Sequence, residues 1–188
     1  MLDFERLIRY IYERSFHRKR GDLQLTDPEF EHHVDINLIK VYTTAMCYLK
    51  NKQDAEDVTQ NVFLKLYTHS DNFIDDDHIR AWLLRCTINE CKDLLRSHWY
   101  KFSEPLEAAD DKVYNEQSNE NDRLLRIMQK LNKNNRIVLY LYYYEEYSCS
   151  EISKIIGISE DAVSARLIRG RKQLKKLIEN KRGLNYNE

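Results

Sequence analysis

A glycine separates two helix-like segments near the C-terminal end of the chain, in the stretch EISKIIGISEDAVSARLIRGRKQLKKLI. Before this glycine, Ile152, Ile155 and Ile156 recur at the spacing of one helix face, and Ser150 can cap the first turn. Gly157 can adopt the backbone conformation that ends a helix in a tight turn. The stretch therefore predicts two helices that meet at a short turn.

The second helix of this pair has apolar residues on one side and hydrogen-bond donors on the other. Ser159 can cap it, and Val163 and Leu167 fall on its inward face. Such a helix-turn-helix can place its second helix in a DNA major groove, where arginine can contact guanine and lysine can contact phosphate. A basic hairpin that binds another protein is the alternative. The candidate DNA-contacting residues are Ser159, Ser164, Arg166, Arg169, Arg171 and Lys172.

The rest of the chain also predicts helices. Only four glycines and two prolines occur among 188 residues, which favours helices over a turn-rich β architecture. Thr26 and Pro28 are typical of a helix start, so a helix is expected from residue 27 to about residue 49. Asp54 can cap a second helix with an apolar stripe. A third long helix is expected over about residues 77–100.

Two small helical domains joined by a linker are the predicted architecture, so the fold class is all-α. The run IVLYLYYY at 137–144 suits a helix or a buried strand. A helix is expected there because both neighbours are helical. Residues 102–119 are acidic, polar and without periodicity, as in a flexible linker. The predicted parts are an extension of unassigned role at 1–25, a domain at 26–101, this linker, and the helix-turn-helix domain at 120–182.

Charge is segregated along the chain although the net charge is only −1. Residues 54–77 hold seven acids and one base, whereas residues 80–101 hold five bases and two acids. The same alternation follows, with seven acids and one base at 103–122 and eight bases and three acids at 160–182. Any one run could be a solvated helix face. Their alternation indicates two surfaces that face nucleic acid and a separate surface for another partner.

Several classes of protein are not supported by the sequence. No apolar stretch approaches the roughly 20 residues of a membrane span, and no signal peptide is evident, so a cytoplasmic protein is expected. The four cysteines are scattered, and Cys86 and Cys91 would point about 140° apart on a helix, which does not suit a shared metal. No phosphate-binding loop or nucleophile elbow occurs. We expect no catalytic residue, metal or cofactor.

Three blocks together resemble the extracytoplasmic-function (ECF) sigma factors, a group of the sigma-70 family of bacterial RNA polymerase. The blocks are DAEDVTQNVFLKLY, AWLLRCTINECKDLLRS and NRIVLYLYYYEEYSCSEISKIIGISEDAVSARLIRGRKQLK, in that order. The resemblance implies that residues 26–101 are sigma region 2, which binds core polymerase and melts the −10 element. It implies that residues 120–182 are region 4, which reads the −35 element. Ser164 and Ala165 depart from the family pattern.

The resemblance also implies site residues and partners. The partners would be promoter DNA, the β′ clamp helices and β flap of core RNA polymerase, and an anti-sigma factor. A regulator that binds duplex DNA by itself is the alternative function. Residues implied to bind core polymerase are Asp54, Glu56, Asp57, Gln60, Asn61 and Phe63, and those implied to bind the −10 element are Arg80, Arg85, Asn89, Lys92 and Arg96.

Overall fold

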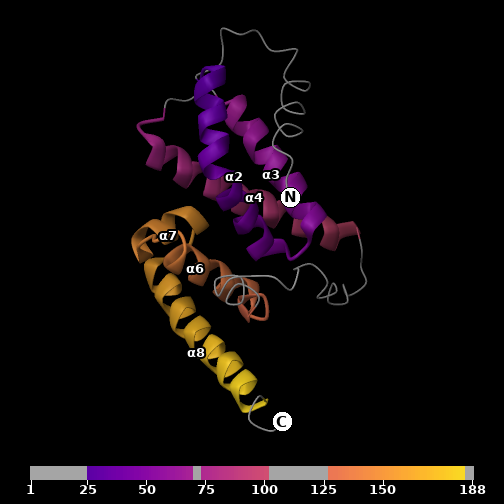
Figure 1. Cartoon of the computed structure of the whole chain (residues 1–188), viewed down its shortest axis with the longest axis vertical. Coiled ribbons are helices and arrows are strands. Elements are labelled where there is room, and N and C mark those ends of the chain that lie inside the picture. Colours follow the sequence, from indigo (N-terminus) through magenta and orange to yellow (C-terminus); the bar gives the residue numbers. More distant parts are fainter. Residues whose placement is uncertain (1–24, 70–72, 102–126, 185–188) are drawn as a thin grey trace. The chain divides into compact units, whose positions relative to one another are not determined.

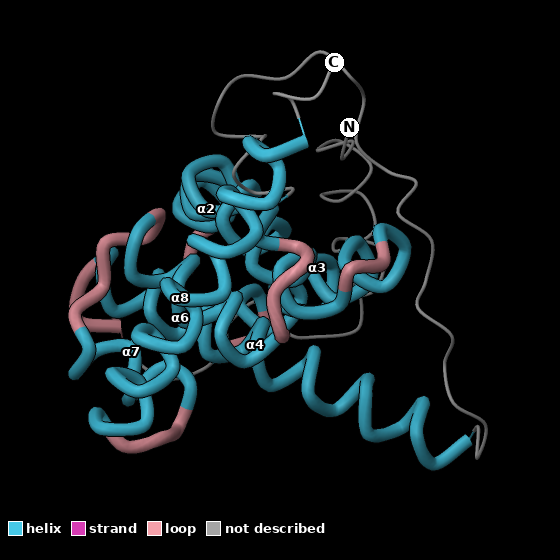
Figure 2. Tube along the Cα trace, turned by 90° about the horizontal axis from the view of Figure 1, so that it is seen from below, coloured by secondary structure: helices cyan, strands magenta, loops and turns pink. Residues whose placement is uncertain are grey.

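The computed structural model describes residues 25–69, 73–101 and 127–184, and every regular element in these ranges is an α-helix (Figures 1 and 2). The chain divides into two compact units, Met1–Glu107 and Ala108–Glu188. The all-α prediction with two helical domains is confirmed. The predicted linker and residues 1–24 of the predicted extension lie outside the described residues. No helix within the described ranges is long and apolar enough to cross a membrane.

The first unit consists of α2 (Asp27–Leu49), α3 (Lys52–Tyr67) and α4 (Asp76–Lys101), and each of these helices packs against the other two. Its core is formed by apolar side chains from all three helices, because each helix turns one apolar face inward. Among the most deeply buried are Phe30, Val34, Ala45, Val62, Phe63, Leu66, Leu83, Leu84 and Ile88.

Helix α2 begins as the sequence predicts. Thr26 caps it in a capping box, in which the Thr26 backbone N–H donates to Glu29 Oε2 at 2.8 Å. These hydrogen bonds to Thr26 lower the pKa of the Glu29 carboxyl. The helix ends at Lys50, which has a left-handed backbone (φ 62°).

Helix α3 begins earlier than predicted. Its N-cap is Asn51, whose side-chain oxygen accepts a hydrogen bond from the Asp54 backbone N–H at 3.1 Å. Asp54 therefore lies in the first turn and is not the cap. A carboxylate in the first turn is still stabilised by the helix macrodipole.

The second unit contains α6 (Lys133–Tyr143), α7 (Cys149–Ile156) and α8 (Glu160–Leu184). The ambiguous apolar run is helical, as predicted, and supplies the buried Val138, Leu139 and Leu141 of α6. Arg136 is also buried, and its Nη1 donates to the carbonyl oxygens of Gln129 and Leu131 at 3.1 and 3.0 Å. This guanidinium thus satisfies carbonyl groups at the end of the preceding turn.

The turn between α7 and α8 has the predicted glycine but a different cap. Gly157 adopts a left-handed conformation (φ 75°) and ends α7, as the sequence predicts. Ser148, and not Ser150, caps α7, because Glu151 lies three residues after Ser148 and its carboxylate accepts a hydrogen bond from the Ser148 N–H at 2.8 Å. The helix-turn-helix itself is as predicted.

Candidate functional site

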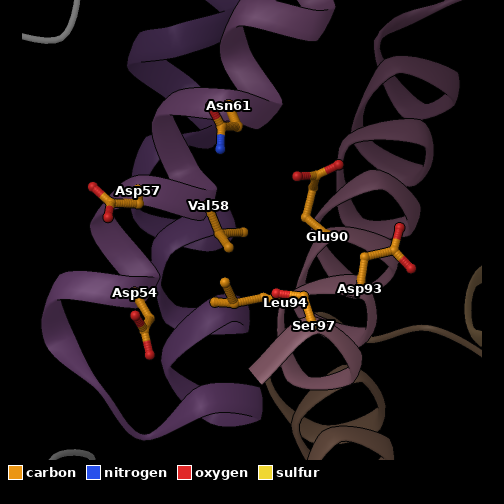
Figure 3. Close-up of a pocket in the computed structure, with 8 residues that line it drawn as sticks. All are labelled: Asp54, Asp57, Val58, Asn61, Glu90, Asp93, Leu94 and Ser97. Carbon is orange, nitrogen blue, oxygen red and sulfur yellow. The ribbon is translucent and has the colours of Figure 1, made fainter. Parts of the chain in front are cut away.

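An acidic groove lies between α3 and α4 in the first unit (Figure 3). Its volume is about 280 Å³. Carboxylates occupy both of its walls, and the apolar side chains of Val58 and Leu94 lie between them. The lining residues are Asp54, Asp57, Val58 and Asn61 from α3 and Glu90, Asp93, Leu94 and Ser97 from α4.

The α3 wall holds three of the six residues predicted to bind a partner. Asp54, Asp57 and Asn61 follow one another at spacings of three and four, so they share one helix face. Asp57 is exposed, and its Oδ1 accepts a hydrogen bond from Gln53 at 3.4 Å. Gln60 is half-buried and lies one turn beyond Asp57. This face can therefore present carboxylates and amides to a basic partner.

Two of the six predicted residues lie elsewhere. Phe63 is completely buried, so its side chain is not part of the exposed face of α3. Its side chain is part of the core because α3 packs against both α2 and α4 and buries two sides. Glu56 lies away from the groove face and faces Lys52 Nζ at 3.8 Å.

The α4 wall was not predicted. Glu90 forms an ion pair with Lys65 of α3, and Asp93 forms one with Arg96. The two acids stand three residues apart within a basic segment. That spacing was the signal in the sequence that they share one surface.

A basic stripe runs along another side of α4. Arg85, Asn89, Lys92 and Arg96 recur every three or four residues, and Asn89 is exposed. Arg80 precedes Asn89 by nine residues, which places it about 180° away around the helix. It faces Asp77 Oδ1 at 2.7 Å. The structure therefore gathers four of the five residues predicted for this surface and separates Arg80 from them.

Aromatic rings cluster where α3 ends and α4 begins. The rings of His69 and Trp82 have centroids 4.7 Å apart, and those of Phe73 and Trp82 are 5.6 Å apart. All three side chains are half-buried, so part of each ring faces solvent. Exposed aromatic faces can stack with unpaired bases.

The two thiols of α4 are less acidic than an exposed cysteine. Burial raises the pKa of Cys86 to about 11 and that of Cys91 to about 12. Both thiols therefore stay protonated near neutral pH and are weak nucleophiles.

The outward face of α8 holds part of the predicted DNA-contacting set. Ser164, Arg169 and Lys172 are exposed. Ser159 is exposed as well and caps the helix, since its Oγ accepts a hydrogen bond from the Ala162 N–H at 3.2 Å. These four residues are available to a ligand that approaches the N-terminal half of α8.

The other two predicted residues are less accessible or are engaged within this unit. Arg166 is half-buried. The Nε of Arg171 donates to the hydroxyl of Tyr143 at 2.9 Å, and its guanidinium carbon lies 5.5 Å from the ring centroid of Tyr142. Arg171 is thereby held against α6 by a hydrogen bond and a cation–π contact.

Sequence reasoning missed one residue of the α8 face. Ile168 is 64% exposed, although Val163 and Leu167 of the same helix are buried. Its position outside the apolar stripe of α8 was the available signal.

Comparison with known proteins identifies similar chains. The family described as Sigma-70 region 2 matches residues 34–100, and the family described as Sigma-70, region 4 matches residues 121–174. The ECF RNA polymerase sigma factor SigM of Bacillus subtilis is 30% identical over 155 residues, which cover 77% of this chain and 91% of SigM. SigW of the same organism is 29% identical over 174 residues, covering 84% of this chain and 91% of SigW.

Two solved structures have a similar fold. One is the sigma factor RpoE in complex with the anti-sigma factor NepR from Bartonella quintana, with a TM-score of 0.68 at 19% identity, covering 80% of this chain and 96% of the other. The second is CnrH in complex with the cytosolic domain of CnrY, with a TM-score of 0.58 at 24% identity, covering 95% and 99%.

Proposed function

The chain belongs to the ECF sigma factors of bacterial RNA polymerase, and we propose that its three exposed polar surfaces divide the work of such a factor. A sigma factor binds core RNA polymerase and directs initiation at specific promoters. The groove face of α3 would bind the polymerase, the basic stripe of α4 would hold the −10 element, and the outward face of α8 would read the −35 element. The observation that carries the proposal is that the acidic and basic surfaces lie on separate helices or separate sides of one helix.

The groove face of α3 suits a basic helical partner such as the β′ clamp helices. Asp54, Asp57, Gln60 and Asn61 combine negative charge with amide groups that fix orientation. Glu90 and Asp93 extend the negative surface onto α4. Since each of these two acids already pairs with a cation of this chain, Asp54 and Asp57 are the carboxylates most available to the polymerase.

The basic stripe of α4 suits single-stranded DNA. Arg85 and Lys92 can neutralise phosphates along a strand, and Arg96 can do so by exchanging its exposed ion pair with Asp93 for a phosphate. Asn89 lies among them and is exposed, and its amide can donate to and accept from the edge of an unstacked base. We assign Asn89 the recognition of one base of the −10 element. The domain boundaries of this account are region 2 at 26–101 and region 4 at 120–182.

An anti-sigma factor is also proposed as a partner. The similar structure of RpoE contains the anti-sigma factor NepR. The similar structure of CnrH contains the cytosolic domain of CnrY. A protein of this kind would inhibit the factor by covering the surfaces that the polymerase needs.

The β flap of the polymerase is the partner proposed for region 4.

Reversal of one charge tests the polymerase surface. Asp57→Lys should weaken capture of core polymerase about tenfold or more, because it places a like charge against a basic partner. The fold should be retained, since the described contact of the Asp57 side chain is one exposed hydrogen bond of 3.4 Å with Gln53. The measurement is a titration of core polymerase against the immobilised full-length chain.

Asp35→Lys is the matched control, because Asp35 is an exposed acid on α2 that lies outside the groove. It should bind core polymerase like the unmodified chain. Equal binding by Asp57→Lys and Asp35→Lys would contradict the assignment of the groove face.

A further inference from the structure

Ile168 is a large apolar side chain on the polar face of α8. It is 64% exposed, whereas Val163 and Leu167 on the other side of the helix are almost fully buried. Gly170 is buried as well, since a Cβ placed there would lie 2.8 Å from Leu139 Cδ1. The buried side of α8 is therefore closed against α6, and Ile168 has no place in the core.

The neighbours of Ile168 identify the ligand that this face suits. Ser164 precedes Ile168 by one turn and Lys172 follows it by one turn, so the three side chains share a face with the half-buried Ala165. Arg169 and Lys172 are exposed cations beside it. Cations around an apolar centre suit duplex DNA, because they can hold the phosphates on either side of a groove.

The major groove offers one apolar group to such a residue. The 5-methyl group of thymine is the hydrocarbon on the base-pair edges, and the other groups there are hydrogen-bond donors and acceptors. Arg166 is half-buried and Arg171 is held by Tyr143, so the exposed cations beside Ile168 are Arg169 and Lys172, which can contact phosphates. We propose that Ile168, together with Ala165, contacts the 5-methyl group of a thymine in the −35 element and makes that position specific for thymine. The inference rests on the proposed role of α8.

The test removes the methyl group and the isoleucine separately. A promoter is enriched from DNA randomised at the −35 element by holoenzyme assembled from core polymerase and this chain. Each thymine of the selected −35 element is then replaced in turn by deoxyuridine, which lacks only the methyl group. At one of these thymines, replacement by deoxyuridine should raise the dissociation constant of the holoenzyme for the promoter about fourfold. This factor corresponds to the free energy of burying one methylene group.

The Ile168→Ala variant should respond differently at the same position. Holoenzyme with this variant should bind the deoxyuridine promoter with a dissociation constant within about twofold of that of the unmodified holoenzyme. It should no longer distinguish thymine from deoxyuridine at that position. Ile39→Ala removes an equally large exposed side chain from α2 and should keep the full preference for thymine. Lys172→Ala should weaken binding to both promoters equally, because phosphate contacts do not read the base.

Any one of three results would contradict the proposed contact between Ile168 and thymine. Ile168→Ala could retain the preference for thymine at every position, it could lose binding to both promoters alike, or the selected element could contain no thymine. If scrambling the −35 element did not change binding of the holoenzyme, the proposed role of α8 in reading that element would be contradicted. This result is distinct from the three above, which contradict only the contact between Ile168 and thymine.

Discussion

His33 is a buried histidine of α2 whose side chain faces the start of α4. Its side chain is 7% exposed, and its Nε2 lies 3.8 Å from Asp76 Oδ1. Burial lowers the pKa of His33, because it disfavours the charged imidazolium, whereas the Asp76 carboxylate opposes this effect. Asp76 is 73% exposed, so water weakens its attraction, and burial decides the direction.

The lowered pKa of His33 predicts a pH dependence of stability. The unfolded chain takes up a proton near the ordinary pKa of 6.5, while the folded chain takes it up only at lower pH. This contribution to the free energy of unfolding is therefore complete above about pH 6.5 and is lost as the pH falls toward the folded pKa. The slope should be at most about 1.4 kcal/mol per pH unit.

Urea unfolding followed by tryptophan fluorescence measures this slope, since Trp82 and Trp99 both lie in α4. In the His33→Gln variant, the free energy of unfolding should lose the part of its pH dependence between pH 7 and 5 that comes from His33. His32→Gln is the matched control, because His32 is exposed, and should keep it. An unchanged slope in His33→Gln would contradict the account.

At the scale of elements, periodicity predicts which helices form, but several polar residues compete to cap each one. Ser148 and Ser150 both precede the apolar face of α7, and the structure uses Ser148 because Glu151 can complete its capping box. Ser150 is followed three residues later by Ser153, which offers no carboxylate. A sequence rule that includes the reciprocal acid would have chosen Ser148.

The site residues were predictable where one helix face decides their exposure. Asp57 and Asn89 lie opposite an apolar stripe and are accessible, as the sequence predicts. Phe63 was not predictable in this way, because α3 is buried on two sides and only the packing of three helices shows it. The ring contacts that hold Arg171 likewise depend on how α6 meets α8.

The left-handed backbone at Gly157, in the turn between α7 and α8, predicts how a substitution there changes the stability of the second unit. Gly157→Ala should destabilise the second unit by about 1–2 kcal/mol, because a side chain disfavours the left-handed backbone. Apart from its chain neighbours, no heavy atom of the described residues lies within 4 Å of the added Cβ, so the cost comes from the backbone and not from a clash. Gly157→Asn, which tolerates this conformation better, should cost less.

Amide hydrogen exchange of peptides from α7 and α8 measures this effect within the full chain. Protection should fall in Gly157→Ala and recover in part in Gly157→Asn. Equal protection in all three proteins would show that the turn does not limit the stability of this unit.

At the scale of the whole molecule, the distribution of charge predicts that this sigma factor needs the polymerase to bind promoter DNA. The net charge is −1, and the basic surfaces of α4 and α8 occur in a chain that also carries the acidic groove. Sequence-independent binding to DNA depends on the neutralisation of phosphates, so a chain of this charge should bind DNA weakly by itself. Core polymerase would supply the remaining affinity and position both units on one promoter.

Parallel selection of random duplex DNA by the chain alone, by core polymerase alone and by the two together tests this dependence most directly. We predict that a two-part sequence with a −35 and a −10 element emerges only from the mixture, and that thymines near its −10 element become reactive to permanganate. Recovery of the same sequence by the chain alone, with an affinity that core polymerase does not change, would contradict the account and indicate an autonomous DNA-binding regulator.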